Sequence, residues 1–351
     1  MKILQMVDVP WDSGLAHYAL ALAQGLQKKG HQVFVSAIPG EKPWHKAHRL
    51  GLKTIPLVSL KGLRPLRRFL RDHHIDLINA HTGSTHSLAV AAALGQKIAV
   101  VRTRSDARAV KRRPGSRFLY KHTQRAIAAA DYIRDSFLRE LKLPPRKVVT
   151  VYQGIPVEAF PVEPFPKTPV IGIVARLDPV KGHRYLIEAM PMLLASYPDL
   201  RLRIVGQEEN IKMRELSAIA ARLRVSHHVD FLGYQSNVGK VMSECSIGAV
   251  SSLGSEAVSR VALEWMACGR PVVATKVGCL PEIVLPKVTG YLVESKDAPA
   301  LAVALAKLLH DPAKALAMGQ EAQRQARERF AMGLFIDKTL EVYKAALGEL
   351  L

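Results

Sequence analysis

The chain has few cysteines. Its 351 residues include only Cys245, Cys268 and Cys279, and each lies within an apolar stretch. Their odd number and spacing exclude a framework of paired disulfides and the paired-cysteine motifs of zinc sites. We therefore expect a reducing, cytoplasmic environment for this protein.

Aromatic residues and long apolar runs are also scarce. Aromatic residues make up 6% of the chain, and no helix-turn-helix, zinc or RNA-binding signature accompanies its basic stretches. This argues against specific nucleic acid binding. No apolar run approaches the roughly 20 residues of a membrane-spanning helix, and the opening MKILQMVDV has the pattern of a strand, not of a signal peptide. We expect neither a membrane span nor an export signal.

A glycine-rich dinucleotide fingerprint is missing as well. The expected first strand, Lys2 to Val9, is followed by Pro-Trp-Asp12-Ser13-Gly14-Leu-Ala, which contains a single glycine. This excludes the fingerprint of NAD-linked enzymes. A lone glycine in a strand-to-helix turn commonly serves backbone geometry, so the residues leave open whether Gly14 has a further role.

What the chain has is a regular alternation of short apolar runs with helical patterns. A length of 351 residues, 48% of them hydrophobic, suits two domains, and the alternation predicts a doubly wound parallel sheet in each. The expected strands lie near Ile3, Val33, Ile55, Ile75, Ala99, Ile127 and Val149 and, in the second domain, near Ile171, Leu202, Val229, Ile247, Val272 and Tyr291.

The proline-rich stretch Gln153 to Thr168 has neither strand nor helix periodicity and marks the predicted boundary. We therefore expect domains at 1–155 and 168–332. The last helical pattern lies at about 333–351.

Two cations follow a buried strand in the second half. The run Val170 to Ala175 predicts a parallel strand, and Arg176 and Lys181 come at or just past its carboxyl end. Ligands of open α/β sheets bind at that edge. The forked guanidinium and the compact ammonium suit phosphate oxygens, so the pair could hold a diphosphate and stabilise it as it departs.

Two acids follow another such strand, Ile247 to Ser251. Glu256 is expected on the turn into a helix that runs to about Ala267, and Glu264 lies deeper in that helix. Backbone N–H groups at the helix start, around Ala257 to Ser259, would face an anion. A carboxylate at Glu264 can accept hydrogen bonds from paired sugar hydroxyls.

These motifs together resemble glycosyltransferase family 4, whose retaining enzymes have the GT-B fold of two domains facing a central cleft. The resemblance covers nearly the whole chain. Besides the cations and acids, it rests on the opening strand with its loop, Val151-Tyr-Gln-Gly-Ile-Pro, Phe231-Leu-Gly-Tyr and Gly269-Arg-Pro-Val-Val-Ala-Thr-Lys-Val-Gly.

The resemblance implies a role for each matching residue. Arg176 and Lys181 would bind the donor diphosphate, Glu264 its ribose and Glu256 the transferred sugar, so that Glu256, Arg176 and Lys181 are the catalytic candidates. The further donor-binding candidates are Gly14, Ala257 and Val258. The family also implies that no metal or other cofactor takes part, and that the last helical pattern, about 333–351, crosses back onto the first domain.

The sequence departs from the family pattern at three positions. Ser105 stands where many relatives have a histidine, Ala257 replaces a glycine, and Gln153 replaces an asparagine. The donor-sugar contact of that histidine is therefore not carried over. We expect an unusual donor sugar or a reshaped site.

Charge is distributed very unevenly. Residues 1–150 contain 27 lysines and arginines against 9 acids, and residues 151–351 contain 23 against 21, which gives +18 and +2 of the total +20. The resemblance to GT-B enzymes implies that the first domain holds the acceptor, so its charge suggests an acceptor that is anionic or embedded in an anionic surface. The basic residues gather in an amphipathic stretch with Lys61, Arg64, Arg67, Arg68 and Arg71, and in the segment 102–125. The alternative is a soluble basic surface without a partner.

Polar residues at carboxyl edges of the first domain are the acceptor-side candidates. His81 and Ser84 follow the strand Ile75 to Ala80, and Arg102 and Arg104 belong to the basic segment. His81 and His86 lack a third partner for a metal site.

We therefore expect a cytoplasmic, metal-independent retaining glycosyltransferase, peripheral on the inner face of the plasma membrane. Its partners would be a nucleotide diphosphate-sugar and an anionic glycan or glycolipid of lipopolysaccharide core or surface-polysaccharide assembly. The alternative is a noncatalytic basic adaptor that binds a membrane or a polyanion on the same scaffold.

Overall fold

The computed structural model describes residues 1–57, 62–254 and 256–350. The chain divides into two compact units, residues 1–154 with 332–351, and residues 155–331. The helix α14 (Met332–Gly348) thus belongs to the first unit, where the final helical pattern was expected. The second unit begins at Ile155, earlier than 168, because the proline-rich segment is part of it.

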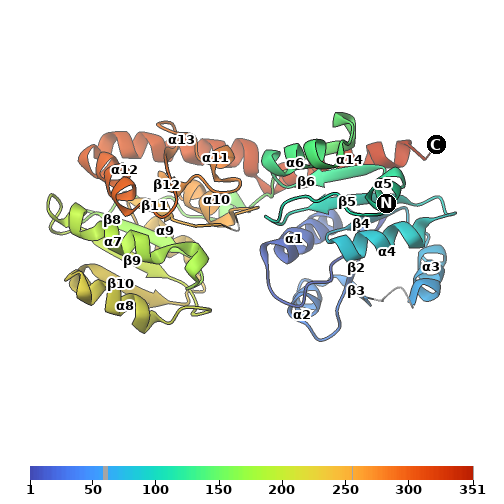
Figure 1. The fold of residues 1–351 in the computed structure, drawn as a ribbon, viewed down its shortest axis with the longest axis horizontal. Helices are drawn as coiled ribbons and strands as arrows, with labels where there is room; N and C mark the ends of the chain where they lie inside the picture. Colours follow the sequence, from blue (N-terminus) through green and yellow to red (C-terminus); the bar gives the residue numbers. More distant parts are fainter. Residues whose placement is uncertain (58–61, 255, 351) are drawn as a thin grey trace. The chain divides into compact units, whose positions relative to one another are not determined.

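The first unit contains a seven-stranded parallel sheet in the order β3-β2-β1-β4-β5-β6-β7 (Figure 1). Its strands are β1 (Lys2–Met6), β2 (Gln32–Ala37), β3 (Lys53–Pro56), β4 (Leu77–Ala80), β5 (Ala99–Arg104), β6 (Arg125–Ala128) and β7 (Val148–Thr150). Besides α14, its helices are α1 (Gly14–Lys28), α2 (Lys42–Arg49), α3 (Leu63–Asp72), α4 (Gly83–Ala93), α5 (Ser116–Lys121) and α6 (Asp131–Leu141).

The second unit contains a six-stranded parallel sheet in the order β10-β9-β8-β11-β12-β13. Its strands are β8 (Val170–Val174), β9 (Arg201–Val205), β10 (Val229–Gly233), β11 (Ile247–Val250), β12 (Val272–Thr275) and β13 (Gly290–Val293). Its helices are α7 (His183–Leu194), α8 (Met213–Arg222), α9 (Val238–Ser243), α10 (Arg260–Ala267), α11 (Leu280–Ile283), α12 (Ala298–His310) and α13 (Pro312–Phe330).

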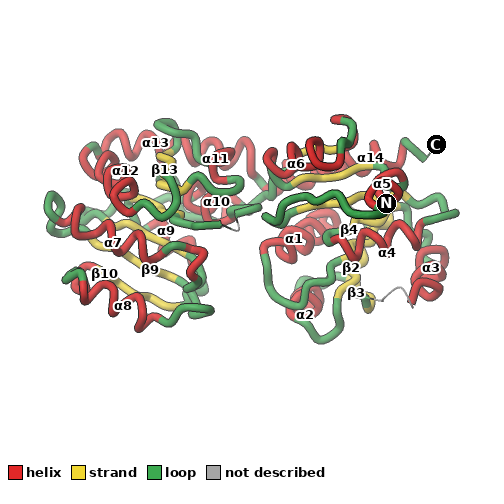
Figure 2. The backbone as a smooth tube through the Cα atoms, viewed as in Figure 1, coloured by secondary structure: helices red, strands yellow, loops and turns green. Residues whose placement is uncertain are grey.

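Both sheets are doubly wound, and their helices flank the strands (Figure 2). In each sheet the order reverses once, between β1 and β4 and between β8 and β11. Such a reversal leaves a crevice beyond the carboxyl ends of the two neighbouring strands, and ligands of open α/β sheets bind there. The prediction of two doubly wound parallel sheets is confirmed.

The helix α14 is held to the first sheet by a buried polar network. The Tyr343 hydroxyl accepts a hydrogen bond from Gln5 Nε2 at 3.0 Å and another from Asn79 Nδ2 at 2.7 Å. Asn79 Oδ1 in turn accepts one from the Thr103 hydroxyl at 2.9 Å. Because buried polar groups are costly unless paired, this network fixes the position of α14 on strands β1, β4 and β5.

The amphipathic helix α3 turns its apolar side into the first unit. Leu66 and Leu70 are buried in the core, and Leu63 and Phe69 pack against it. Core packing therefore accounts for the apolar stripe. Arg67 donates to backbone carbonyls at the end of α4, whereas Arg64, Arg68 and Arg71 are exposed and remain for solvent or an anionic surface. Lys61 lies outside the described residues.

Candidate active site

The loop after β8 is shaped by Asp178. Its Oδ1 accepts a hydrogen bond from the Val180 N–H at 2.9 Å, which starts a short 3-10 turn over Pro179–Lys181, and its Oδ2 accepts one from Asn210 Nδ2 at 2.7 Å. Burial raises the pKa of Asp178, but these hydrogen bonds and the charges of Arg176 and Lys181 outweigh it and hold the pKa below its ordinary value. Asp178 therefore carries a negative charge that shapes the loop.

Lys181 and Glu256 are joined at the reversal point of the second sheet. Lys181 Nζ donates to Glu256 Oε1 at 2.6 Å, although 75 residues separate them in the sequence. The Ser252 hydroxyl donates to the same oxygen, also at 2.6 Å. The Glu256 side chain is 3% exposed and that of Lys181 is 19% exposed. Two donors thus fix Oε1, while no described side chain donates to Oε2.

Two glycines let the backbone come close around this pair. A Cβ on Gly182 (φ +70°) would lie 2.0 Å from the Ser251 carbonyl oxygen, and one on Gly278 (φ +57°) would lie 2.0 Å from the Glu256 carbonyl oxygen. The Cys279 N–H donates to that carbonyl at 2.8 Å. Only glycine fits these positions, because both the positive φ and the missing side chain are required.

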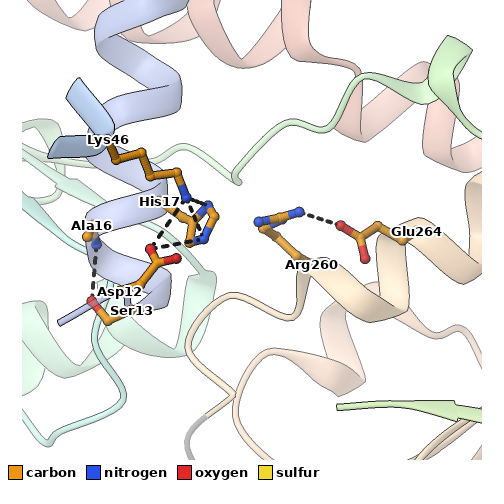
Figure 3. Close-up of polar contacts among 7 residues, drawn as sticks. All are labelled: Asp12, Ser13, Ala16, His17, Lys46, Arg260 and Glu264. Carbon is orange, nitrogen blue, oxygen red and sulfur yellow. Dashed lines mark hydrogen bonds and ion pairs between the residues drawn. The ribbon is translucent and has the colours of Figure 1, made fainter. Parts of the chain in front are cut away.

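Glu264 is placed by the packing of α10 on the sheet. The neighbouring Trp265 is fully buried, and a Cβ on Gly172 of β8 or Gly248 of β11 would lie 2.5 or 2.4 Å from its ring. Glu264 Oε1 accepts a hydrogen bond from Arg260 at 2.6 Å (Figure 3). Arg260 was not among the predicted site residues, and the i, i+4 spacing of the two was the available signal.

The start of α10 differs from the prediction. The helix begins at Arg260, so Ala257 and Val258 lie in bends before it and not in its first turn. Within the described part of the chain, no backbone carbonyl accepts a hydrogen bond from their N–H groups. Unpaired N–H groups beside a lysine still suit an anion, but they are presented by a bend, not by a helix end.

Arg176 is held more loosely than Lys181. Its side chain is 52% exposed, and its nitrogens lie 3.5 Å from Glu209 and 3.8 Å from Asp178. Exposed ion pairs of this length are weak. The guanidinium can therefore exchange these carboxylates for a ligand anion at little cost.

Gly14 is the first residue of α1, at the reversal point of the first sheet. Its φ is not positive, and a Cβ there would meet nothing within 4 Å. The Ser13 side chain caps the helix by accepting from the Ala16 N–H at 3.2 Å (Figure 3). The backbone therefore does not need glycine at position 14.

His81 and Ser84 occupy the same reversal point but differ in exposure. The exposed Ser84 donates its hydroxyl hydrogen to Asp8. His81 is fully buried and its Nε2 lies 2.8 Å from Gln5 Oε1, within the network that holds α14. Burial, aided by Arg102, lowers the pKa of His81 to about 3. The structure thus gives His81 a place in the fold, where we had expected it to face an acceptor.

The two arginines of β5 are also less available than expected. Arg102 is 3% exposed and donates to the backbone carbonyls of Ala80 and Thr103. Arg104 is partly buried and pairs with Asp106 at 3.2 Å. Arg102 therefore ties β5 to β4, and it does not present its charge to solvent.

A cluster of three charged or ionisable side chains near Gly14 was missed by sequence reasoning. Asp12 Oδ1 lies 3.2 Å from His17 Nε2 and 3.4 Å from Lys46 Nζ, and Lys46 Nζ lies 2.9 Å from His17 Nε2 (Figure 3). The His17 hydrogen bond is the main cause that lowers the pKa of Asp12 to about 2. Lys46 comes from α2, so only tertiary structure completes this cluster.

Neither a metal cluster nor a membrane span was found in the part of the chain that the structure describes. No group of three or more His, Cys, Asp or Glu side chains there is placed to hold a metal ion. No helix there combines the length and apolarity needed to cross a bilayer.

Two family models match the chain. The model for glycosyl transferases group 1 matches residues 156–325, and the model for glycosyltransferase family 4 matches residues 13–159. The chain is also similar to a D-inositol 3-phosphate glycosyltransferase of Segniliparus rotundus, with 36% identity over 186 residues. That match covers 52% of this chain and 41% of the relative, so it spans less than half of the relative's length.

Solved structures resemble the chain over its whole length. A glycosyltransferase of Rickettsia africae has a TM-score of 0.90 at 19% identity, covering 99% of this chain and 98% of its own. The Anabaena protein HepE in complex with UDP has a TM-score of 0.85 at 20% identity, covering 98% and 100%. At these identities the likeness shows the fold.

Proposed function

The chain belongs to glycosyltransferase family 4, the group 1 glycosyltransferases, with a GT-B fold, and on this premise we propose that it transfers a sugar from a nucleotide diphosphate-sugar to an anionic glycan or glycolipid. We further propose that the transfer retains the anomeric configuration and needs no metal ion.

The observation that carries the proposal is the Lys181–Glu256 pair. It joins the loops after β8 and β11, where the order of the second sheet reverses and a ligand crevice is expected. Glu256 keeps one carboxylate oxygen for the hydroxyls of a sugar while the other is held by Lys181 and Ser252. A lysine beside this carboxylate supplies the charge that a departing diphosphate needs.

Residues other than Lys181 and Glu256 are also proposed to contact the donor. Arg176, loosely paired, would move onto the diphosphate together with the N–H groups of Ala257 and Val258. Glu264 would accept hydrogen bonds from the ribose hydroxyls. Gly14 would allow the backbone of the first unit to approach the ligand. We give it this role because the fold of the first unit does not require a glycine at position 14.

The chemistry of transfer is then mainly electrostatic. In the retaining route the acceptor hydroxyl attacks from the face that the diphosphate leaves, and the departing phosphate takes the acceptor proton. Lys181 and Arg176 stabilise the negative charge that develops on that phosphate. A preorganised cation is worth about two to three orders of magnitude in rate at such a position.

The charge of the first unit supports an anionic acceptor. Residues 1–150 contain 27 lysines and arginines against 9 acids. On the first unit we place Ser84, Arg104 and the cationic side of α3 toward the acceptor or the surface that carries it. Assembly of lipopolysaccharide core or surface polysaccharide, on the inner face of the plasma membrane, fits such a partner.

Nucleotide-dependent thermal stabilisation tests the proposal. The protein is heated with UDP, GDP, ADP, CMP and dTDP sugars, with and without EDTA, beside the variants Glu264→Gln and Glu294→Gln. One sugar nucleotide should raise Tm in the parent and in Glu294→Gln, whose carboxylate is 69% exposed, and lose the effect in Glu264→Gln. A ligand at 100 times its Kd stabilises by about 2.7 kcal/mol.

Each other outcome has a meaning. Loss of the shift in EDTA would contradict metal independence. Absence of any shift would favour the noncatalytic adaptor, which needs the basic surface but no donor. Once the donor is known, NMR of the product's anomeric proton decides between retention and inversion.

A further inference from the structure

A second concentration of cations lies away from the reversal points, around a cavity of the first unit. The cavity has a volume of about 400 Å³ and lies between α5 and the segment that follows α6. Five of its ten lining residues are cations, and no acid lines it among the residues that the structure describes. These cations are Arg112, Arg117, Lys121, Lys142 and Lys147. We call it the α5–α6 pocket.

The five cations have no counter-charge in direct contact. None of them forms an ion pair with a described acid within 4.0 Å. Lys147 donates to the Tyr120 carbonyl, and burial with Arg125 and Arg146 holds the pKa of Lys147 below its ordinary value. Glu349 offsets part of this, but it is itself paired with Arg125. Uncompensated like charges repel, so an anion here would be stabilising.

Helix ends explain only part of this charge. A helix carries partial negative charge at its carboxyl end, so a lysine there is favourable by itself. Lys121 ends α5 and Lys142 caps α6, which accounts for one cation at each helix. The remaining cations, Arg112, Arg117 and Lys147, have no such reason to point into the same cavity.

The pocket also offers apolar surface. Leu141, Leu143 and Pro144 line it on the α6 side, and Tyr120 lines it from α5. Its volume falls in the range of small-molecule sites, about 300 to 1,000 Å³. A cationic rim around an apolar lining fits a phosphate group attached to carbon, better than a bare inorganic ion.

The position of the pocket separates it from the donor and acceptor sites. Lys121 precedes β6, which begins at Arg125, and Lys147 directly precedes β7, which begins at Val148. The pocket therefore lies by the amino ends of these strands. Gly14 and Ser84 follow the carboxyl ends of β1 and β4, which form the opposite edge of the same parallel sheet.

We propose that the α5–α6 pocket is a second anion site, which binds a phosphate ester distinct from the sugar donor. The ester could be a lipid headgroup or a soluble phosphorylated molecule, because the five cations and the apolar lining recognise the chemistry that both share. The site does not depend on the proposed glycosyl transfer, since the residues that form it lie on another edge and in one unit.

The test compares two variants that remove the same charge from the same unit. Arg117→Ala with Lys121→Ala removes two exposed pocket cations from α5, and Lys28→Ala with Arg49→Ala removes two exposed cations from α1 and α2. Glycerol 3-phosphate binding is measured by titration calorimetry at low salt, and binding to phosphatidylglycerol and phosphatidylcholine vesicles by sedimentation. A third variant, Lys181→Met, removes the donor-site cation.

The α5 variant should lose about tenfold or more in affinity, as expected for lost charge-assisted contacts, while the variant in α1 and α2 and the Lys181→Met variant keep the parent's affinity. A loss of affinity for glycerol 3-phosphate in the α5 variant shows that a soluble phosphate ester is sufficient for binding to the pocket. A loss of affinity only for phosphatidylglycerol vesicles shows that the phosphate ester recognised by the pocket is a lipid headgroup. Equal affinity in the α5 variant and the variant in α1 and α2, loss in Lys181→Met alone, or no binding of either probe overturns the proposal.

Discussion

Both units are built on a doubly wound parallel sheet whose strand order reverses once. The residues at this reversal point are packed differently in the two units. In the second unit the backbone packs closely around the buried carboxylate of Glu256 and its partly buried partner Lys181, through glycines that no other residue could replace. In the first unit Gly14 is sterically unconstrained, and the polar side chains nearby either serve the fold or lie exposed. The second unit therefore has the more preorganised site.

The difference also concerns charge. The first unit's excess cations lie largely on its surface and around the α5–α6 pocket, whereas the cations and acids of the second unit nearly balance. A preorganised site suits one small ligand, while a broad charged surface suits a large or variable partner. The following predictions test this contrast.

The largest effect is expected from Lys181→Ala. It should lower turnover about 100-fold or more, and it should lower the free energy of unfolding by about 3 kcal/mol, because the buried carboxylate of Glu256 loses its only described cation. Steady-state kinetics and urea denaturation measure both.

The double variant Lys181→Met with Glu256→Gln separates the two effects. Stability should return while turnover stays low. The control Lys276→Ala, whose partner Glu294 is exposed, should cost less than about 1 kcal/mol. Full turnover in Lys181→Ala would remove Lys181 from the mechanism.

The next largest difference between the units is expected when a glycine at each reversal point is replaced by alanine. Gly278→Ala should cost about 3 kcal/mol or more, since φ is +57° and the new Cβ would lie 2.0 Å from the Glu256 carbonyl oxygen. Gly14→Ala should change the free energy of unfolding by less than about 1 kcal/mol.

Urea denaturation measures both glycine variants. If the missing side chain at Gly14 lets the ligand approach the backbone, Gly14→Ala should raise KM for the donor while the free energy of unfolding stays nearly the same. Similar destabilisation by both substitutions would show that the first reversal point is as tightly packed as the second.

Acid should weaken the first unit more than the second. Burial lowers the pKa of His81 and His86 in the first unit to about 3 and that of His183 in the second to about 4. In the unfolded chain these histidines bind a proton near pH 6.5. Their contribution to the free energy of unfolding is therefore complete above that pH, and it falls as the pH drops toward the pKa values of the folded chain. The slope is about 1.4 kcal/mol per pH unit and histidine.

Hydrogen exchange of β5 and β12 between pH 7 and pH 5 reports the two units separately. The variant His86→Gln should flatten the dependence for β5 alone. An equal slope for both strands would contradict the assignment of two buried neutral histidines to the first unit.

The smallest effects are expected from the helical ion pairs. Arg260→Ala removes the partner of Glu264, whose side chain is 7% exposed, and should cost about 1 to 2 kcal/mol, because a buried carboxylate loses a hydrogen bond to an arginine that is itself 39% exposed. Arg68→Ala in α3, whose side chain is 79% exposed, should cost less still. Thermal unfolding measures both, and a loss above about 3 kcal/mol for Arg260→Ala would show that the position of Glu264 depends on this arginine.

The sequence by itself determined the strands and the family. Apolar runs of four to six residues between helical patterns placed the strands of both sheets, with β4 beginning two residues after Ile75. Arg176, Lys181 and Glu256 were located because polar residues after a buried strand must lie at its carboxyl edge. These inferences succeed because periodicity and strand ends are local properties of the chain.

Tertiary structure decided which of these residues meet. The contact between Lys181 and Glu256 depends on β8 and β11 being neighbours, and the cluster of Asp12, His17 and Lys46 depends on the position of α2. His81 is buried in the polar network that holds α14, and Arg102 is bonded to the Ala80 carbonyl of the neighbouring β4, whereas the α5–α6 pocket forms from two segments that meet only in the folded unit. Periodicity records how each segment faces the core, whereas partners, exposure and cavities arise from segments distant in the chain.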